Sequence, residues 1–162
     1  MPLRINPDNG EPYLQLAAPF SSIRITPPRE ADAPAATAII QDPLVYPFLQ
    51  GPPFPFTEQD ALDYIRIIKP GCDKVFLEIK PYLDQGIADF VASGCPVRSI
   101  REVQADGTEI YIGDIGIDRS GYEELALSDA NEQQRMADIN ETKPIGDPSI
   151  DWTIGGMSAD VT

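Results

Sequence analysis

Proline interrupts this chain along most of its length, and no other feature limits the possible folds so strongly. Of its 162 residues, 17 are proline and 12 are glycine. Because proline fixes φ and lacks a backbone donor, it ends helices and is excluded from central strands. The sequence therefore predicts few, short helices and strands joined by long loops. A chain of this length forms one domain, which can bury about two thirds of the surface exposed in its unfolded form.

The charge balance is acidic and excludes some classes of partner. There are 26 acidic residues against 12 basic ones, which gives a formal net charge of −14. Such a chain repels the phosphate backbone, so a broad nucleic-acid-binding surface is excluded. A basic or amine-bearing partner would be attracted, although an acidic surface that serves only solubility also explains the charge.

Several other classes are excluded by what the sequence lacks. No stretch has the roughly 18 consecutive apolar residues of a membrane span, and the opening MPLRINPDNG lacks a signal-peptide core. We therefore expect a cytoplasmic protein without a membrane partner. Histidine is absent, so hydrolase sites that use a histidine base are excluded. Cys72 and Cys95 lie too far apart for a metal knuckle, so buried free thiols are expected and no metal site is predicted.

The N-terminal part contains an extended segment, a strand and a helix. Residues 1–22 show no sustained periodicity and are expected to form an extended arm. In SIRITPP, alternating residues predict a strand over 23–26 that ends at two prolines. A helix is predicted over 32–41, where Asp32 can cap the first turn and Pro34 is tolerated near the start.

The segment VYPFLQGPPFPF follows, and its four prolines exclude a helix or a central strand. It also carries four aromatic residues, which are Tyr46, Phe48, Phe54 and Phe56. These rings can fill the core between two helices. They can also form the aromatic wall of a substrate groove, since proline holds the loop at low entropic cost. Both roles are compatible on different rings.

The most regular helical pattern follows this loop. Thr57 is the expected N-cap with Asp60 three residues later, and the apolar stripe consists of Ala61, Tyr64, Ile65 and Ile68. Pro70 and Gly71 are expected to end this helix. Apolar residues at helical spacing over 72–83 then predict a short third helix with a structural role.

The periodicity then changes to that of strands. RSIREVQADGTEIYIGDIGIDR predicts two strands joined by a tight turn at Asp106 and Gly107. The second strand covers 110–118. Inside it, Gly113 and Gly116 indicate either a β-bulge or the close approach of another backbone or a ligand.

Residues 119–149 form a polar, acidic segment without clear periodicity, which is unusual inside a compact domain. This acidic insertion is expected to be either a functional excursion or disordered, with a helical turn or two over 129–139. A last strand is predicted over 151–155.

Four segments of this chain carry a resemblance to a known family. They are IRITPPREADAPA at the first strand and helix, YPFLQGPPFPFTEQDALDYI across the loop and second helix, IGDIGIDR in the third strand and DWTIG in the fourth. Their order is similar to the N-terminal half of the GNAT superfamily of acetyl-CoA-dependent N-acetyltransferases, in particular its ribosomal-protein N-acetyltransferase-like branch with fungal members. The resemblance implies an α/β (α+β) fold with a mainly antiparallel sheet and two to three helices, as a partial domain over 23–155.

The resemblance also bears on the cofactor. In that family the fourth strand leads into a glycine-rich loop, and the helix that follows holds the pyrophosphate of acetyl-CoA at its N-terminus. This sequence has GMSADVT after Gly155, without that loop motif or a basic residue. We therefore expect that residues 156–162 are an aberrant tail, as from an altered gene model, and that this chain does not bind acetyl-CoA. The alternative is a genuine half-domain.

The catalytic residues stay unassigned. The family often has a glutamate two residues before the glycine that is here Gly155, and this chain has Thr153 there. Asp114 and Asp151 are carboxylates on nearby strands, and surface solvation explains both. The candidate substrate-binding residues are the aromatic ones, namely Tyr46, Phe48, Phe54, Phe56 and Trp152.

Two functional hypotheses from different classes follow. The first is an N-acetyltransferase-like chain whose family transfers acetyl from acetyl-CoA to a primary amine on a small molecule or peptide N-terminus, incomplete and inactive in this form. The second is a binding or regulatory half-domain that performs no chemistry. In both, the unpaired edge of the fourth strand is expected to favour self-association.

Overall fold

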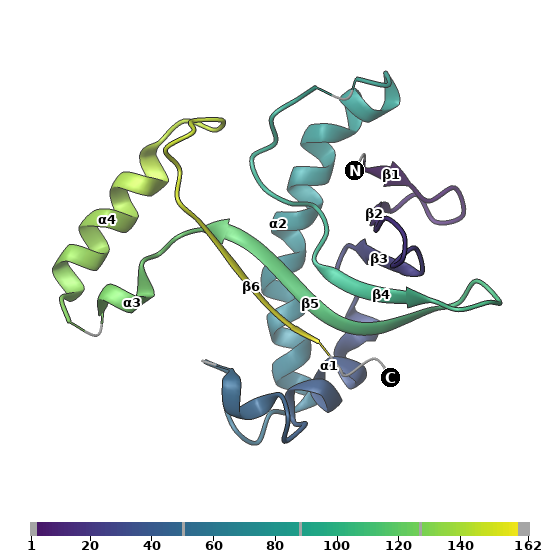
Figure 1. Cartoon of the computed structure of the whole chain (residues 1–162), viewed down its shortest axis with the longest axis horizontal. Helices are drawn as coiled ribbons and strands as arrows, with labels where there is room; N and C mark the ends of the chain where they lie inside the picture. Colours follow the sequence, from purple (N-terminus) through teal and green to yellow (C-terminus); the bar gives the residue numbers. More distant parts are fainter. Residues whose placement is uncertain (1–2, 50, 88, 127, 159–162) are drawn as a thin grey trace.

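The structure is a computed structural model that describes residues 3–49, 51–87, 89–126 and 128–158. Its centre is a six-stranded antiparallel sheet in which the strands lie in sequence order (Figure 1). The strands are β1 Arg4–Ile5, β2 Pro12–Gln15, β3 Ile23–Thr26, β4 Ser99–Val103, β5 Glu109–Arg119 and β6 Trp152–Ser158. The expected α+β class with a mainly antiparallel sheet is confirmed.

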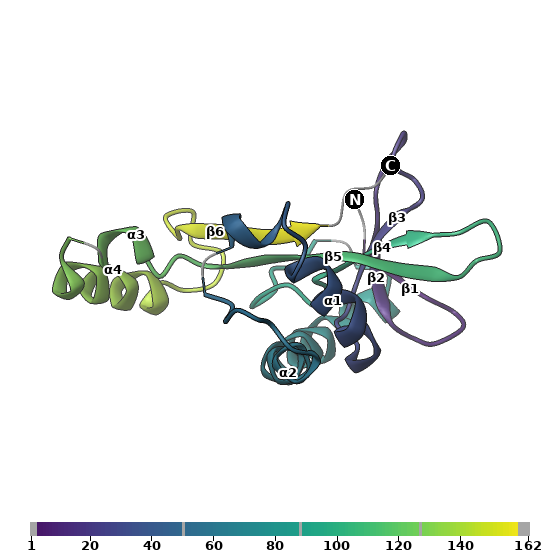
Figure 2. The same ribbon diagram turned by 90° about the horizontal axis from the view of Figure 1, so that it is seen from below.

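Two helices, α1 Ala33–Ile40 and α2 Glu58–Asp84, lie side by side on one face of the sheet (Figure 2). Short 3₁₀ turns precede α1 at Glu30–Asp32 and lie in the proline-rich loop at Tyr46–Phe48. Helices α3 Glu123–Ala126 and α4 Ala130–Thr142 lie apart from these, beyond the end of β5 (Figure 1). Across the described ranges, no helix has the length and apolar character needed to cross a membrane.

The core lies between α1, α2 and the sheet. Its buried cluster consists of Ala33, Ala36 and Ile40 from α1, Ala61 and Ile65 from α2, and Phe56 from the loop between them. Tyr111 on β5 and Met157 on β6 pack against this cluster from the sheet. The apolar stripe predicted for the second helix is thus confirmed at Ala61 and Ile65, whereas Tyr64 is exposed.

Helix α2 begins as predicted. Thr57 Oγ1 accepts a hydrogen bond from the Asp60 amide at 3.2 Å, and the Thr57 amide donates to Asp60 Oδ2 at 2.8 Å. This reciprocal pair satisfies two amides that the helix itself leaves free.

The end of α2 differs from the prediction. The helix runs for 27 residues through Pro70 and Gly71, so the predicted break and the separate helix over 72–83 are wrong. An interior proline costs about 3 kcal/mol. Here Pro70 lies on the exposed side of the helix. The buried stripe continues on both sides of it, and this packing offsets the cost; the stripe consists of Ala61, Ile65, Cys72, Val75 and Ile79.

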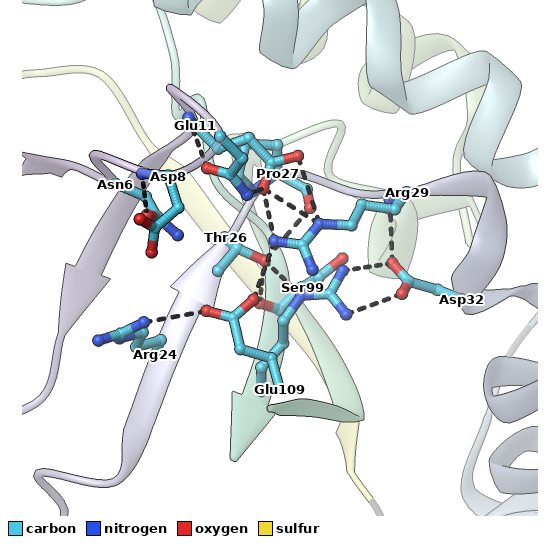
Figure 3. Close-up of polar contacts among 12 residues, drawn as sticks. Asn6, Asp8, Glu11, Arg24, Thr26, Pro27, Arg29, Asp32, Ser99 and Glu109 are labelled. Atoms are coloured by element: carbon cyan, nitrogen blue, oxygen red, sulfur yellow. Dashed lines mark hydrogen bonds and ion pairs between the residues drawn. The ribbon is translucent and has the colours of Figure 1, made fainter. Parts of the chain in front are cut away.

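The N-terminal arm was expected over 1–22, and its described residues contribute the strands β1 and β2 to the sheet. Strands β1 and β2 pair with each other, and β2 pairs with β3. Figure 3 shows the ion pairs that hold this arm in place: Arg29 Nη2 lies 2.9 Å from Glu109 Oε2, and Arg29 Nε donates to Glu11 Oε2 at 3.1 Å. Glu109 also binds Arg24 at 3.1 Å. Charge pairs thus order a segment that has no apolar periodicity.

Asp32 does not cap α1 with its side chain, contrary to the prediction. Its carboxylate instead accepts from both terminal nitrogens of Arg101, Nη1 at 2.8 Å and Nη2 at 2.7 Å, and from the Arg29 amide at 2.9 Å. Both side chains of the pair are buried, and Arg101 Nε also donates to Thr26 Oγ1 at 2.7 Å. A bidentate, desolvated ion pair therefore connects β4 to the start of α1.

The hairpin β4–β5 turns at Asp106 and Gly107 as predicted, and Gly107 has a φ of +87°. A bulge interrupts the pairing, because Ile100 lies opposite Gly113 whereas Arg101 lies opposite Tyr111. The one residue between them on β5 is unpaired, and this resets the alternation of side chains. As a result, Tyr111 and Asp114 both face the helices and line the same small interior cavity.

The two glycines of β5 have separate explanations. A Cβ at Gly113 would lie 2.2 Å from the carbonyl oxygen of Met157, so glycine permits the close approach of β6. A Cβ at Gly116 would lie 2.0 Å from Nη2 of Arg98, whose side chain crosses the strand there. The bulge and the close approach of another backbone are therefore both present.

The described residues of the acidic insertion over 119–149 include the helices α3 and α4. Asp129 caps α4 by accepting from two amides of its first turn, at 3.1 and 3.0 Å. At the other end, the fully buried Asn140 donates to the carbonyl of Asp151 at 2.8 Å and accepts from its amide at 3.0 Å. Polar contacts to the base of β6 thus replace the apolar pattern that the segment lacks.

Strand β6 is longer than the predicted 151–155. It pairs with β5 from Trp152 to Ser158, so residues 156–158, the first part of the expected aberrant tail, belong to the sheet. Residues 159–162 lie outside the described residues. Since β6 is the last strand of the sheet, its outer edge has no partner strand within the described part of the chain.

Candidate functional site

A pocket with a volume of about 710 Å³ lies where α2, β5, β6 and the proline-rich loop meet. Leu49 and residues of the loop over 51–56 form one wall, and the α2 residues from Asp60 to Ile67 form a second. Strands β5 and β6 form the third wall, on the face of the sheet that carries the helices. The fold therefore assembles the pocket from segments that lie far apart in the sequence.

Carboxylates outnumber cations around this pocket. It is lined by five of them, Asp60, Asp63, Asp114, Asp118 and Glu123, and by the two guanidinium groups of Arg98 and Arg119. Both arginines are already engaged. Arg98 Nη1 lies 3.1 Å from Asp118 Oδ2, and Arg119 donates to backbone carbonyls at the end of α4. The pocket is therefore negative, which favours a cationic ligand and disfavours an anion.

Asp114 is the buried member of this group, with 8% of the residue exposed. The bulge in β5 turns its carboxylate toward α2, where it lies on the pocket wall. Its Oδ1 lies 3.9 Å from Arg98 Nη2, which is beyond hydrogen-bond distance. No hydrogen bond to the carboxylate is found within the described residues, so the group is free to accept one from a ligand.

Burial raises the pKa of Asp114 from 3.8 to about 6, against the opposing effect of Arg98. The negative charges of Asp118 and Asp32 raise this pKa further. From α2, Tyr64 faces the same group, and its own pKa is raised by burial and by the charge of Asp114. A carboxylate that is buried in a pocket and titrates near neutrality is typical of a functional site.

The thiol of Cys72 lies behind this wall on α2 and is buried and free. Burial raises its pKa to about 11, so the thiol stays protonated and is unsuited to act as a nucleophile. Cys95 is also free, and it is half-buried, not buried as expected.

The five aromatic residues predicted to bind substrate do not form one wall. Only Phe56 lines the pocket, and it is also part of the core. The rings of Tyr46 and Phe54 pack against each other with centroids 4.1 Å apart, whereas Phe48 is 83% exposed. Trp152 lies at the start of β6 beneath the guanidinium of Arg119, 6.0 Å from its ring centroid. A binding role for these residues stays a prediction.

Asp114 is the site residue that the sequence interpretation missed. Surface solvation was expected to explain both Asp114 and Asp151, and this is wrong for Asp114 because the bulge at Ile112 turns it inward. Asp151 is exposed as expected. Thr153 lines the pocket. Gly113, which precedes Asp114, is the sequence signal that indicated a bulge at this position of the strand.

No metal centre is evident in the described ranges, where no three His, Cys, Asp or Glu side chains gather in a way that would hold an ion. Comparison with protein-family models, curated proteins and solved structures gives no significant match.

Proposed function

We propose that this chain binds a primary amine in its ammonium form, with Asp114 as the acceptor of the ammonium protons. The observation that carries the proposal is a buried carboxylate, without a hydrogen bond from the described residues, on the wall of an acidic pocket of about 710 Å³. An alkylammonium has a pKa near about 10.4 and is charged at neutral pH. Its charge complements the pocket, and its N–H groups complement Asp114.

The pocket also offers an apolar surface for the rest of such a ligand. Ile67 is exposed on α2, and Leu49 and Phe56 lie across from it on the loop. A ligand with an ammonium group at one end and an apolar body at the other would therefore match both parts. The probe 2-phenylethylamine has this character, and 2-phenylethanol is its uncharged counterpart.

The fold class supports placing this amine site in an N-acetyltransferase-like domain. The order on which the GNAT resemblance rests, strand, helix, loop, helix, hairpin and strand, recurs as β3, α1, the proline-rich loop, α2, β4–β5 and β6.

The described residues do not fit acetyl-CoA, which the family would use. Residues 156–158 continue β6 and pair with β5, where the family has a phosphate-binding loop. The two arginines at the pocket are held by other groups, and the pocket is otherwise acidic. We therefore assign amine binding to this chain and derive no acetyl-transfer step, which agrees with the second, non-catalytic hypothesis.

The test is calorimetric titration of the chain with 2-phenylethylamine and, separately, with 2-phenylethanol. We expect binding of the amine only, and at least about a tenfold loss of affinity in Asp114→Asn, since an ionic hydrogen bond contributes about 1.5–3 kcal/mol. Asp89→Asn is the matched control, because Asp89 is exposed and does not line the pocket. Equal affinity for amine and alcohol, or equal losses in both variants, would overturn the proposal.

A further inference from the structure

The side chain of Arg98 lies between two carboxylates on the pocket wall. Asp114, Gly116 and Asp118 alternate along β5, so they face the same side of the sheet. The guanidinium of Arg98 crosses the strand at Gly116, where a Cβ would lie 2.0 Å from Nη2 and 2.6 Å from Cζ. The backbone of Arg98 is held by hydrogen bonds to β3 and β5, at 2.9 and 2.8 Å. The guanidinium can therefore shift between the two carboxylates by side-chain rotation alone.

The two carboxylates contact Arg98 unequally. Nη1 donates to both oxygens of Asp118, at 3.3 and 3.1 Å, although this carboxylate is exposed. The buried carboxylate of Asp114 lies 3.9 Å from Nη2 and accepts no hydrogen bond from the described residues. Nε of Arg98 is also buried, and it has no hydrogen-bond partner among these residues. A buried donor and a buried acceptor thus belong to neighbouring groups and are not paired with each other.

A small shift of the guanidinium toward Asp114 would satisfy both groups. Nε and Nη2 form the side-on edge of an arginine, which fits a carboxylate with two parallel hydrogen bonds. Such a pair would be shielded from water, whereas the contact with the exposed Asp118 is weakened by it. The closed pair would, however, occupy the carboxylate oxygens that an ammonium ligand needs. The arrangement in the structure is therefore the one that keeps Asp114 available.

We propose that Asp118 is a positioning residue, which holds the guanidinium of Arg98 away from Asp114 and so leaves Asp114 free to accept hydrogen bonds from the amine. Without the carboxylate of Asp118, the guanidinium closes onto Asp114 and competes with the ligand ammonium for the same oxygens. Asp118 thus acts through Arg98 and needs no contact with the ligand. The consequence for binding rests on the proposed amine site, whereas the closing of the ion pair concerns the chain without ligand.

Several elements bring titratable groups to Asp114. They are Arg98 before β4, Tyr111 and Asp118 on β5, Asp32 before α1, and Tyr64 and Cys72 on α2, whereas β6 has no titratable side chain. Burial raises the pKa of Asp114 to about 6, Arg98 lowers it and Asp118 raises it. Removing Asp118 should therefore lower this pKa in two ways, because a repulsion is lost and because Arg98 approaches. Only the second effect requires Arg98, so the two can be separated.

The first experiment follows the titration of Asp114 by carboxyl-carbon NMR in the chain without ligand. Asp118→Ala removes the restraint, and Asp63→Ala is the matched control, because Asp63 is a similarly exposed pocket carboxylate that pairs with Arg66. We expect the pKa of Asp114 to fall from about 6 to about 5 or lower in Asp118→Ala and to change little in Asp63→Ala. In the background of Arg98→Gln, Asp118→Ala should lower this pKa much less.

The Nε–H resonance of Arg98 reports the position of the guanidinium without a second substitution. Above the pKa of Asp114, this proton resonance should move downfield in Asp118→Ala, because Nε then donates to the carboxylate, and it should stay unchanged in Asp63→Ala. Thermal unfolding shows which variants are folded, and the resonance decides alone if Arg98→Gln does not fold. An unchanged resonance in Asp118→Ala, or equal pKa changes with and without Arg98, would overturn the proposal.

Calorimetric titration with 2-phenylethylamine at about pH 8 measures the consequence for binding. We expect Asp118→Ala to weaken binding about threefold or more, and to weaken it less in the background of Arg98→Gln. A wild-type chain that does not bind this amine would refute the proposed function, and the NMR titration would still decide whether Asp118 restrains Arg98. A wild type that binds it, with the same loss from Asp118→Ala in both backgrounds, would leave the amine site standing and overturn the positioning role.

Discussion

Replacing Asp114 by asparagine should stabilise the fold above pH 6, although it removes the charge on which amine binding depends. In the folded chain the pKa of Asp114 is about 6, against 3.8 for an unperturbed carboxyl, and burial is the main cause. The folded state therefore holds this proton more tightly than the unfolded state does. For such a group, stability is highest when the carboxyl is protonated in both states, and it falls as the pH rises through the window from about 4 to about 6.

The magnitude follows from the size of the shift. The two pKa values differ by about two, and each pKa unit corresponds to about 1.4 kcal/mol. Ionised Asp114 therefore costs the folded chain about 3 kcal/mol above pH 6. Asparagine is nearly isosteric and cannot ionise, so the variant avoids this cost.

The assay is urea unfolding of the wild type, Asp114→Asn and the control Asp89→Asn at several pH values from about 4 to about 8. We expect Asp114→Asn to gain up to about 3 kcal/mol relative to the wild type as the pH rises, and little difference near pH 4. The control should follow the wild type throughout. A constant difference between Asp114→Asn and the wild type at all pH values, or a loss of stability that grows with pH, would refute the reasoning.

Three further substitutions test the packing that positions the pocket. Arg101→Ala should lower the free energy of unfolding by about 3–5 kcal/mol, since it leaves the carboxylate of Asp32 buried without its partner. A loss below about 1 kcal/mol in equilibrium unfolding would show that the pair is unimportant. Ile65→Ala should cost about 2–5 kcal/mol because the side chain is in the core, whereas Glu58→Ala on the exposed face should cost little; similar losses would mean that α2 is wrongly oriented. Asn140→Ala should cost about 1–3 kcal/mol and raise hydrogen exchange across 119–151 selectively, and unchanged exchange there would contradict the anchoring role.

The elements that could be predicted from the sequence are those whose signals are local. The hairpin at Asp106 and Gly107 needs only a turn residue with positive φ between alternating strands, and the structure has it. The start of α2 likewise depends on Thr57 and Asp60, which are three residues apart. In both cases the residues that specify the turn or the helix start are neighbours in the sequence and lie within the element itself.

Other elements depend on contacts that local patterns do not contain. Pro70 would end an isolated helix, but the buried residues that follow it keep α2 continuous. The N-terminal arm has no periodicity of its own, and it is ordered by Arg29 and Glu109, which lie 80 residues apart in sequence. Secondary-structure propensity cannot predict either effect, because both depend on contacts between residues that are far apart in the sequence.

The candidate site shows the same division. The aromatic residues were conspicuous in the sequence, yet only Phe56 reaches the pocket. Asp114 could not be recognised as a pocket residue from the sequence, because the alternation of a strand does not say which of its two faces is buried. In addition, the bulge that turns Asp114 inward depends on the pairing of β5 with β4. A pocket made from four separate segments is fixed by topology, so its acidic character could be anticipated only from the net charge.

Amine binding through ionised Asp114 is tested most directly by the pH dependence of the affinity for 2-phenylethylamine. With a pKa of about 6, Asp114 is mostly protonated at pH 5 and ionised at pH 8. The affinity of the wild type should therefore be about tenfold lower at about pH 5 than at about pH 8, with proton release on binding near pH 6. Asp114→Asn should bind weakly and without this dependence. An affinity that is the same at both pH values in the wild type, or that changes equally in Asp114→Asn, would contradict a role for Asp114 as the amine acceptor.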